Sequence, residues 1–266
     1  MKKLLQVLNA ITFVSVVVVN YFSNTGEMNN TTIGEVSGDL TTLFTPAGYA
    51  FSIWGVIYLF LLGFVIYQGR SLFVSVKDDD FILKTGGWFI LSNLANAAWV
   101  FCWLYGYTAW SVVCIFLLLF SLLKIVVNNN MERWDAPLPV IAFLWWPFVI
   151  YSGWVTVACI ANVSAWLQKI GWDGFGISET IWTVIMIVIA GIINFWITWS
   201  RNMREFALVG AWALVAIAIA NWESNSTVKI SALVVAAFLF LSSSYHGFIN
   251  RATNPIEKLK ALRSEK

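Results

Sequence analysis

Two segments of the chain carry amide and indole side chains at helical spacing. In the first segment, Asn96 comes three residues before Trp99. The second segment has four residues at intervals of four, which share one face of a helix: Trp154, Ala158, Asn162 and Trp166. Amides beside aromatic faces and small residues could join helices by hydrogen bonds, or they could line a pocket for a flat hydrophobic ligand.

The side chains that most enzymes, pumps and metal proteins use are absent from the centres of the apolar segments. Asp, Glu, Lys and Arg lie at or beyond the ends of these segments. His246 is the only histidine. The three cysteines are Cys102, Cys114 and Cys159, and no two of them have CxxC spacing. We therefore expect no catalytic residue and no metal site, and a proton-relay pump or a retinal protein is disfavoured.

The composition places these residues in a membrane protein. Apolar residues make up 59% of the 266 residues and charged residues only 11%, against about 25% charged residues in soluble domains. The net charge of +2 is too small for nucleic acid to be expected as a partner. The length leaves room for several helices of about 20 residues that cross a bilayer, and for no large domain outside it.

Eight apolar runs predict an all-helical transmembrane bundle of about eight spans. The runs cover residues 4–22, 46–68, 85–105, 107–127, 138–168, 178–200, 203–222 and 228–249. Gly106 alone separates the third run from the fourth, which predicts a tight helical hairpin. Residues 24–45, between the first two runs, are expected to form a polar loop.

The basic residues predict the orientation of the bundle. If the N-terminus is inside, only Lys169 and Lys229 of the 16 Lys and Arg residues fall on outer segments, which leaves 14 inside. Cytoplasmic loops are enriched in Lys and Arg, so we expect cytoplasmic termini and an even number of spans. Several Trp residues lie near predicted span ends, among them Trp103, Trp110 and Trp222. This placement indicates an aromatic belt.

Three motifs occur in the order in which a known family has them. Pro46 is followed by Trp54 and Tyr58, and Asn96 is followed by Trp99. Residues 154–166 then fit the pattern W-V-[ST]-x-A-x-x-x-N-x-x-x-W. With these motifs the chain resembles the tryptophan-rich sensory protein family, also called the translocator protein or peripheral benzodiazepine receptor family.

The resemblance covers residues 1–170 and implies a five-helix core that binds porphyrins, haem-like tetrapyrroles or sterols in a Trp-lined cavity. It implies aromatic walls and amide anchors at these ligand-binding residues: Trp54, Tyr58, Asn96, Trp99, Trp154, Ala158, Asn162 and Trp166. Beyond this core we expect three additional transmembrane helices in residues 171–250 and a basic cytoplasmic tail in residues 251–266.

The expected function is that of a membrane protein that binds a flat hydrophobic ligand as a sensor, carrier or scavenger. A bound tetrapyrrole is the cofactor that the resemblance implies. Membrane lipid and the small hydrophobic ligand are the expected partners, and a homodimer is left open. We expect a multi-pass protein of a bacterial inner membrane. Two alternatives remain open: an uncoupled small-solute transporter or permease and, less favoured, a membrane enzyme that modifies porphyrins.

Overall fold

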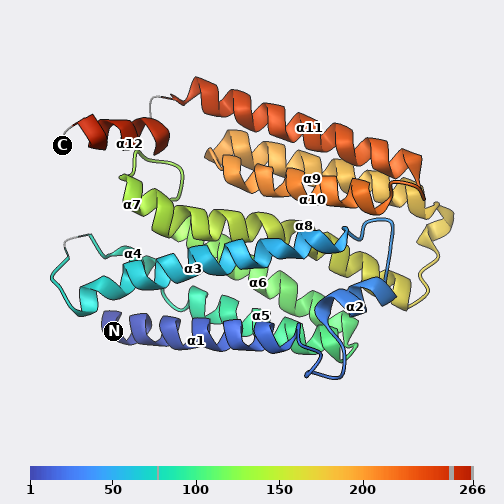
Figure 1. Ribbon diagram of the computed structural model, residues 1–266, viewed down its shortest axis with the longest axis horizontal. Helices are drawn as coiled ribbons and strands as arrows, with labels where there is room; N and C mark the ends of the chain where they lie inside the picture. The colour runs from blue at the N-terminus through green and yellow to red at the C-terminus, as the bar shows by residue number, and fades with distance from the viewer. Residues whose placement is uncertain (77, 252–254, 265–266) are drawn as a thin grey trace.

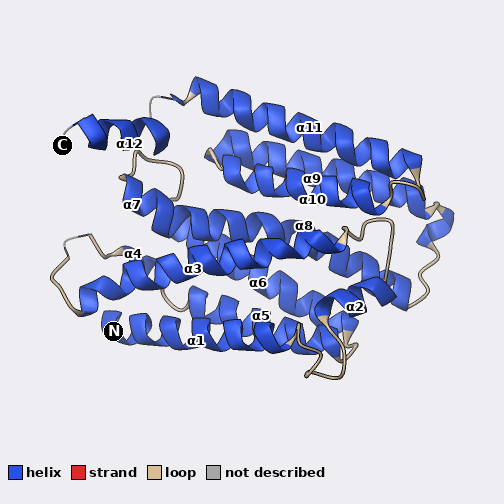
Figure 2. Cartoon of the chain, viewed as in Figure 1, coloured by secondary structure: helices blue, strands red, loops and turns tan. Residues whose placement is uncertain are grey.

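The structure is a computed structural model that describes residues 1–76, 78–251 and 255–264. These residues form helices joined by turns and loops, and none of them lies in a β-strand (Figure 2). The predicted all-helical fold is therefore confirmed. Within the described residues, six helical segments are long and apolar enough to cross a membrane, as in an integral multi-pass membrane protein.

Each predicted apolar run corresponds to one long helix. These helices are α1 (Lys2–Phe22), α3 (Ile53–Gly69), α5 (Trp88–Leu104), α6 (Thr108–Asn128), α8 (Trp146–Lys169), α9 (Glu179–Arg201), α10 (Arg204–Ala220) and α11 (Ser226–Ile249). The helices α5 and α10 have 17 residues each, which is near the lower limit for a span. The number of spans and the cytoplasmic location of the termini therefore stay predictions.

Shorter helical segments lie between the long helices and after them. They are α2 (Ile33–Asp39), η1 (Gly48–Ser52), η2 (Arg70–Leu72), α4 (Phe81–Thr85), α7 (Leu138–Val140), η3 (Ile141–Trp145), η4 (Gly174–Gly176) and α12 (Pro255–Ser264). The segment η3 is a π-helix that connects α7 to α8, so residues 138–169 form one helical rod. The helix α2 lies in the segment that the sequence predicts as a polar loop.

Five long helices form a closed ring. The helix α1 packs against α3 and α5, α5 against α6, α6 against α8, and α8 against α3 (Figure 1). The helices α9, α10 and α11 pack against one another in a second group, which rests on the ring mainly through α10 on α8. The rod that contains α8 therefore lies between the two groups, and 78% of its most apolar stretch is buried, against 28–39% in the other candidate spans.

Small residues allow these helices to approach closely. A Cβ atom on Gly153 of α8 would lie 2.9 Å from the carbonyl oxygen of Phe206 in α10. A Cβ atom on Gly210 of α10 would lie 2.5 Å from Oδ1 of Asn194 in α9. Such close contacts matter in membranes, because lipid provides no hydrophobic driving force between helices and packing must hold them together.

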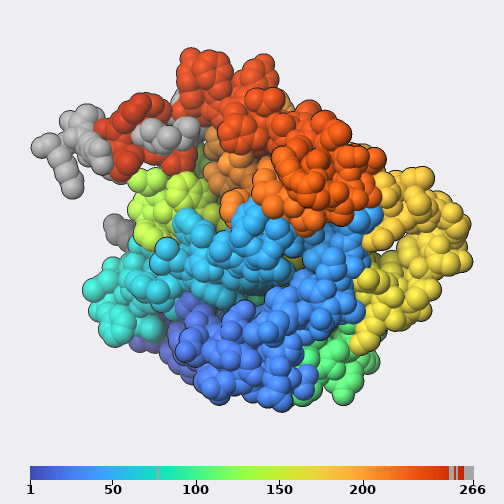
Figure 3. Space-filling model, turned by 45° about the vertical axis from the view of Figure 1, so that its right-hand side comes forward, coloured from blue at the N-terminus to red at the C-terminus, as the bar shows by residue number. Residues whose placement is uncertain are grey.

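The chain ends and the connecting turns define two ends of the bundle. Both termini lie at the same end in Figure 1. At the opposite end, Gly106 adopts φ +74° between α5 and α6 and allows the tight hairpin that the sequence predicts. The segment that joins α8 to α9 also lies there, and it projects from the molecule as the yellow region of Figure 3.

Candidate ligand site

Aromatic rings from α3, α5 and α8 form one cluster. Trp54 of α3 stacks on Tyr58 and on Trp99 of α5, with ring centroids 5.7 and 6.4 Å apart. Trp154 of α8 lies 6.5 Å from Trp54 in an edge-to-face arrangement. The structure therefore brings together four of the predicted ligand-binding residues from three different helices.

A cavity of about 60 Å³ adjoins this aromatic cluster. Five of the predicted residues line it: Trp54, Trp99, Trp154, Ala158 and Asn162. Tyr58 lies behind Trp54 and does not line the cavity, and the half-buried Trp166 also lies outside its walls. The cavity walls are otherwise mostly apolar, so the cavity suits a hydrophobic group.

Asn162 holds the cavity wall together from α8. Its Oδ1 accepts a hydrogen bond of 2.7 Å from Nε1 of Trp99, and its Nδ2 donates one of 2.8 Å to Oγ of Ser111 in α6. Both bonds cross between helices inside an apolar bundle, where an unpaired amide is costly. Asn162 therefore fixes the orientation of the Trp99 ring, and the polar partner Ser111 was not predicted from the sequence.

Asn96 lies one layer behind the cavity. It is fully buried, its Nδ2 donates to the hydroxyl of Tyr151 at 2.6 Å, and its Oδ1 accepts from Nδ2 of Asn20 at 3.0 Å. These bonds join α5 to α8 and to α1. Tyr151 in turn packs against Trp54 with ring centroids 5.7 Å apart. Asn96 thus positions the cluster without lining the cavity.

Two indole N–H groups of the cluster are buried without an acceptor. Nε1 of Trp54 and Nε1 of Trp154 make no hydrogen bond with any residue that the structure describes. A buried donor without a partner costs roughly 1–3 kcal/mol, and the membrane core supplies no water to replace it. Since both residues line the cavity, a ligand with acceptor atoms could satisfy both donors.

The segment that contains α2 covers the cavity. Ile33, Leu40 and Pro46 contribute to its walls. Trp103 also lines it and donates from Nε1 to the carbonyl oxygen of Ile33 at 3.3 Å. The assignment of Trp103 to an aromatic belt is therefore wrong, because the side chain is 6% exposed and stacks on Trp99.

Two further cavities lie outside the aromatic cluster. One, of about 650 Å³, is lined by Thr156, Cys159 and Ile160 of α8 and by Met186 and Ile193 of α9, among others. It lies on another face of α8, and no predicted ligand-binding residue lines it. The other, of about 210 Å³, is polar and lies at the end of the bundle that carries both termini.

These features define a multi-pass helical membrane protein whose core contains a Trp-walled cavity. The family model described as TSPO-like protein matches residues 6–245, and the chain belongs to this family. The family membership predicted from the three motifs is confirmed. The matched range includes α9, α10 and most of α11 as well as the five-helix ring. No curated protein and no solved structure matches the chain closely enough to give a relative.

Proposed function

We propose that this protein binds a flat, hydrophobic ligand with hydrogen-bond acceptors in the Trp-walled cavity. The observation that carries the proposal is the pair of buried indole donors, Nε1 of Trp54 and Nε1 of Trp154, in a wall of stacked aromatic rings. Aromatic faces favour flat ligands. A porphyrin has both the flat hydrophobic face and the acceptor atoms, and family membership supports this ligand class.

The size of the cavity adds a condition to this proposal. Sites for drug-sized ligands measure about 300–1,000 Å³, whereas this cavity measures about 60 Å³. The described conformation is therefore closed, and a tetrapyrrole needs the wall to move. We expect the segment with α2 to be the wall that moves, since it is a helix of seven residues that lies outside the five-helix ring.

Ligand binding of this kind would serve a sensor, a carrier or a scavenger. We propose that the protein acts in one of these three roles and lies in a bacterial inner membrane. It favours binding over catalysis, because the residues that line the cavity include no acid, base or cysteine to carry out a reaction.

Replacing Trp154 with phenylalanine is expected to weaken porphyrin binding about threefold to tenfold. The variant keeps an aromatic ring and loses one hydrogen-bond donor, and one such bond contributes about 0.5–1.5 kcal/mol. The measurement is a titration of the detergent-purified protein with protoporphyrin, followed by quenching of Trp fluorescence. Trp196→Phe is the matched control, because Trp196 is 67% exposed on α9. Equal dissociation constants for the two variants and the wild type would contradict the proposal.

Replacing Gln168 with alanine is expected to speed porphyrin binding about threefold. Nε2 of Gln168 donates to the carbonyl oxygen of Thr41 at 2.8 Å and ties the segment after α2 to the end of α8. Losing one exposed bond of roughly 0.5–1 kcal/mol eases opening of the cavity. Stopped-flow fluorescence gives the association rate. In the control Asn128→Ala, a similar bond to Lys84 at the other end of the bundle is lost, and the rate should not change.

A further inference from the structure

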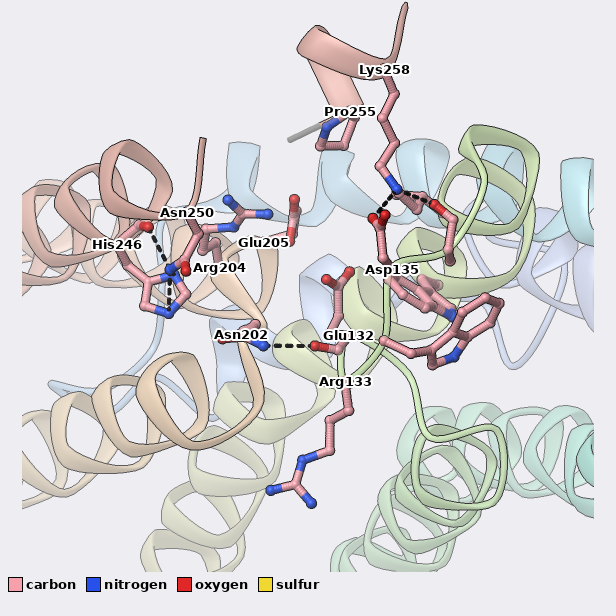
Figure 4. A pocket seen from close by; sticks show the side chains of 14 residues that line it. Glu132, Arg133, Asp135, Asn202, Arg204, Glu205, His246, Asn250, Pro255 and Lys258 are labelled. Carbon is pink, nitrogen blue, oxygen red and sulfur yellow. Dashed lines mark hydrogen bonds and ion pairs between the residues drawn. The ribbon is translucent and has the colours of Figure 1, made fainter. Parts of the chain in front are cut away.

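The polar cavity of about 210 Å³ lies far from the aromatic cluster, at the end of the bundle that carries both termini. Its walls come from the turn between α6 and α7, the start of α10, the end of α11 and α12 (Figure 4). The turn between α6 and α7 belongs to the five-helix ring, whereas α10 belongs to the second group of helices. The cavity therefore exists only because the second group of helices packs on the ring.

Glu132 is the central group of this cavity. Glu132 is only 8% exposed, and its carboxylate points into the cavity in Figure 4. Its main-chain carbonyl accepts a hydrogen bond of 2.8 Å from Nδ2 of Asn202, but the carboxylate makes no hydrogen bond or ion pair with the described residues. An ionised carboxylate on a residue that is largely removed from solvent is costly without a partner, and a cation in the cavity would offset that cost.

Glu205 adds a second incompletely paired carboxylate. Its Oε1 accepts a hydrogen bond of 3.2 Å from Nε1 of Trp146, whereas its Oε2 is buried without a partner in the described part of the chain. Burial, followed by the negative charge of Glu205, raises the pKa of Glu132 to about 8. The two carboxylates are thus close enough to repel each other.

Two of the cations around this cavity are engaged elsewhere. Lys258 of α12 pairs with Asp135 and also donates to the carbonyl oxygen of Ala136. Arg133 extends away from the cavity and donates to the carbonyl oxygen of Ser200 at 3.2 Å (Figure 4). Neither cation therefore forms an ion pair with a glutamate of the cavity.

When Glu132 is ionised, the remaining charges leave the cavity negative. Arg204, at the start of α10, is the cation that faces Glu132 and Glu205. His246 of α11 also lines the cavity, and its ring lies against the side-chain amide of Asn250. With Asp135 and Lys258 included, three carboxylates face two permanent cations once Glu132 is ionised, so the balance favours a cationic ligand above the raised pKa of Glu132.

An unpaired donor adds an independent feature to the same cavity. Trp145 is 3% exposed and lines the cavity, and its Nε1 makes no hydrogen bond with any described residue. Trp134 also lines the cavity and packs against Trp145 with ring centroids 5.5 Å apart. The cavity thus offers aromatic faces, which attract cations, and an N–H group, which needs an oxygen acceptor.

We propose that this cavity binds a small molecule that carries both a protonated amine and an oxygen acceptor. The ammonium group lies between the carboxylates of Glu132 and Glu205, and the oxygen accepts from Nε1 of Trp145. A cavity of about 210 Å³ has room for roughly seven water-sized groups, since one water takes about 30 Å³ of liquid volume, so the ligand is small. A metal ion is less suitable, because in the described residues no three His, Cys, Asp or Glu side chains gather to hold one.

The test is calorimetric titration of the full-length protein in detergent micelles with ethanolamine at pH 8.5, above the raised pKa of Glu132. We expect saturable binding that weakens at least about tenfold in Glu132→Gln and in Glu205→Gln, because a buried charge-assisted contact is lost. Glu257→Gln is the control, since Glu257 is exposed on α12 and pairs with Lys260, and its affinity should match the wild type. Thermal melts confirm that each variant folds. No saturable heat with the wild type, or equal affinities in all variants, would overturn the proposal.

Three further titrations test which features of the ligand and of the cavity determine binding. Ethylamine lacks the oxygen and should bind more weakly than ethanolamine, whereas equal binding would overturn the role of Trp145. Magnesium chloride should give no binding heat that depends on Glu132. Such heat would show that the cavity binds a metal ion and not an amine, and it would overturn the proposal. Ethanolamine should bind more tightly at pH 8.5 than at pH 6.5 in the wild type, because the raised pKa of Glu132 keeps it protonated at the lower pH, and Glu132→Gln should lose this dependence.

The same chemistry occurs in a free amino alcohol and in the headgroup of phosphatidylethanolamine. Titrations in nanodiscs of phosphatidylglycerol, with and without phosphatidylethanolamine, distinguish the two sources. A weaker apparent affinity with phosphatidylethanolamine assigns the cavity to the lipid headgroup, and an unchanged affinity assigns it to the free molecule. Either result supports the amine site, and neither depends on the Trp-walled cavity at a distance from it.

Discussion

Replacing Gly153 with leucine is expected to lower the free energy of unfolding by about 3 kcal/mol or more. A Cβ atom at this position would lie 2.9 Å from the carbonyl oxygen and 3.1 Å from Cα of Phe206. Both atoms belong to the backbone of α10 and cannot rotate away, so the helices must separate. Overpacking of a core typically costs about 1–3 kcal/mol, and occasionally more. Unfolding in mixed detergent micelles, followed by circular dichroism, measures the change.

Gly55 provides the matched control for this substitution. It lies in α3 and is exposed, and a Cβ atom added to it would meet no other atom within 4 Å. Gly55→Leu should leave the stability unchanged or raise it slightly, because glycine is a poor helix former. If Gly153→Leu were as stable as Gly55→Leu, the close approach of α8 and α10 would be refuted.

Replacing Asn96 with leucine is expected to destabilise the protein by about 2 kcal/mol. The change removes the bond of 2.6 Å to the hydroxyl of Tyr151 and the bond of 3.0 Å from Asn20. Each lost bond in a membrane protein contributes roughly 0.6–1.7 kcal/mol, and the former partners remain buried. The same unfolding experiment gives the difference.

A double-mutant cycle with Tyr151→Phe isolates the shorter of these two bonds. The coupling energy between Asn96 and Tyr151 should be about 1 kcal/mol, since the residues are in direct contact. Asn128→Leu is the control, because Asn128 is exposed at the end of α6 and bonds only to the carbonyl oxygen of Lys84. A coupling energy of zero would show that Asn96 does not tie α5 to α8.

The long helices could be predicted from the sequence because their boundaries are set locally. The run 107–127 became α6 (Thr108–Asn128), and Gly106 formed the expected turn before it. The helix α2 was not predicted, although its signal is present. Thr32 and Glu35 form a capping box, in which Oγ1 of Thr32 accepts from the Glu35 N–H at 3.2 Å and Oε2 of Glu35 accepts from the Thr32 N–H at 2.8 Å.

The walls of the aromatic cavity could be predicted only in part. Helical spacing placed Trp154, Ala158 and Asn162 on one face, and all three line the cavity. The partners Ser111 and Tyr151 depend on how neighbouring helices rotate and slide against α8. Periodicity in one segment carries no information on that rotation.

The polar cavity could not be predicted for a different reason. Glu132 lies in a turn and Glu205 at the start of a helix, and at such positions a charged residue ordinarily faces water. Nothing in the local sequence distinguishes them from solvated residues. Their burial follows from the docking of α10 and α11, which is a long-range event.

The π-helical segment Ile141–Trp145 sets the rotational phase between the two cavities that the rod of residues 138–169 lines. Each residue of an α-helix turns the chain by about 100°, and a π-turn accommodates one residue more than an α-turn. Ile141 and Trp145 can therefore line the polar cavity while Trp154 lines the aromatic one. Removing one residue from this turn would leave the hydropathy of the span intact and put the linings of the two cavities out of phase.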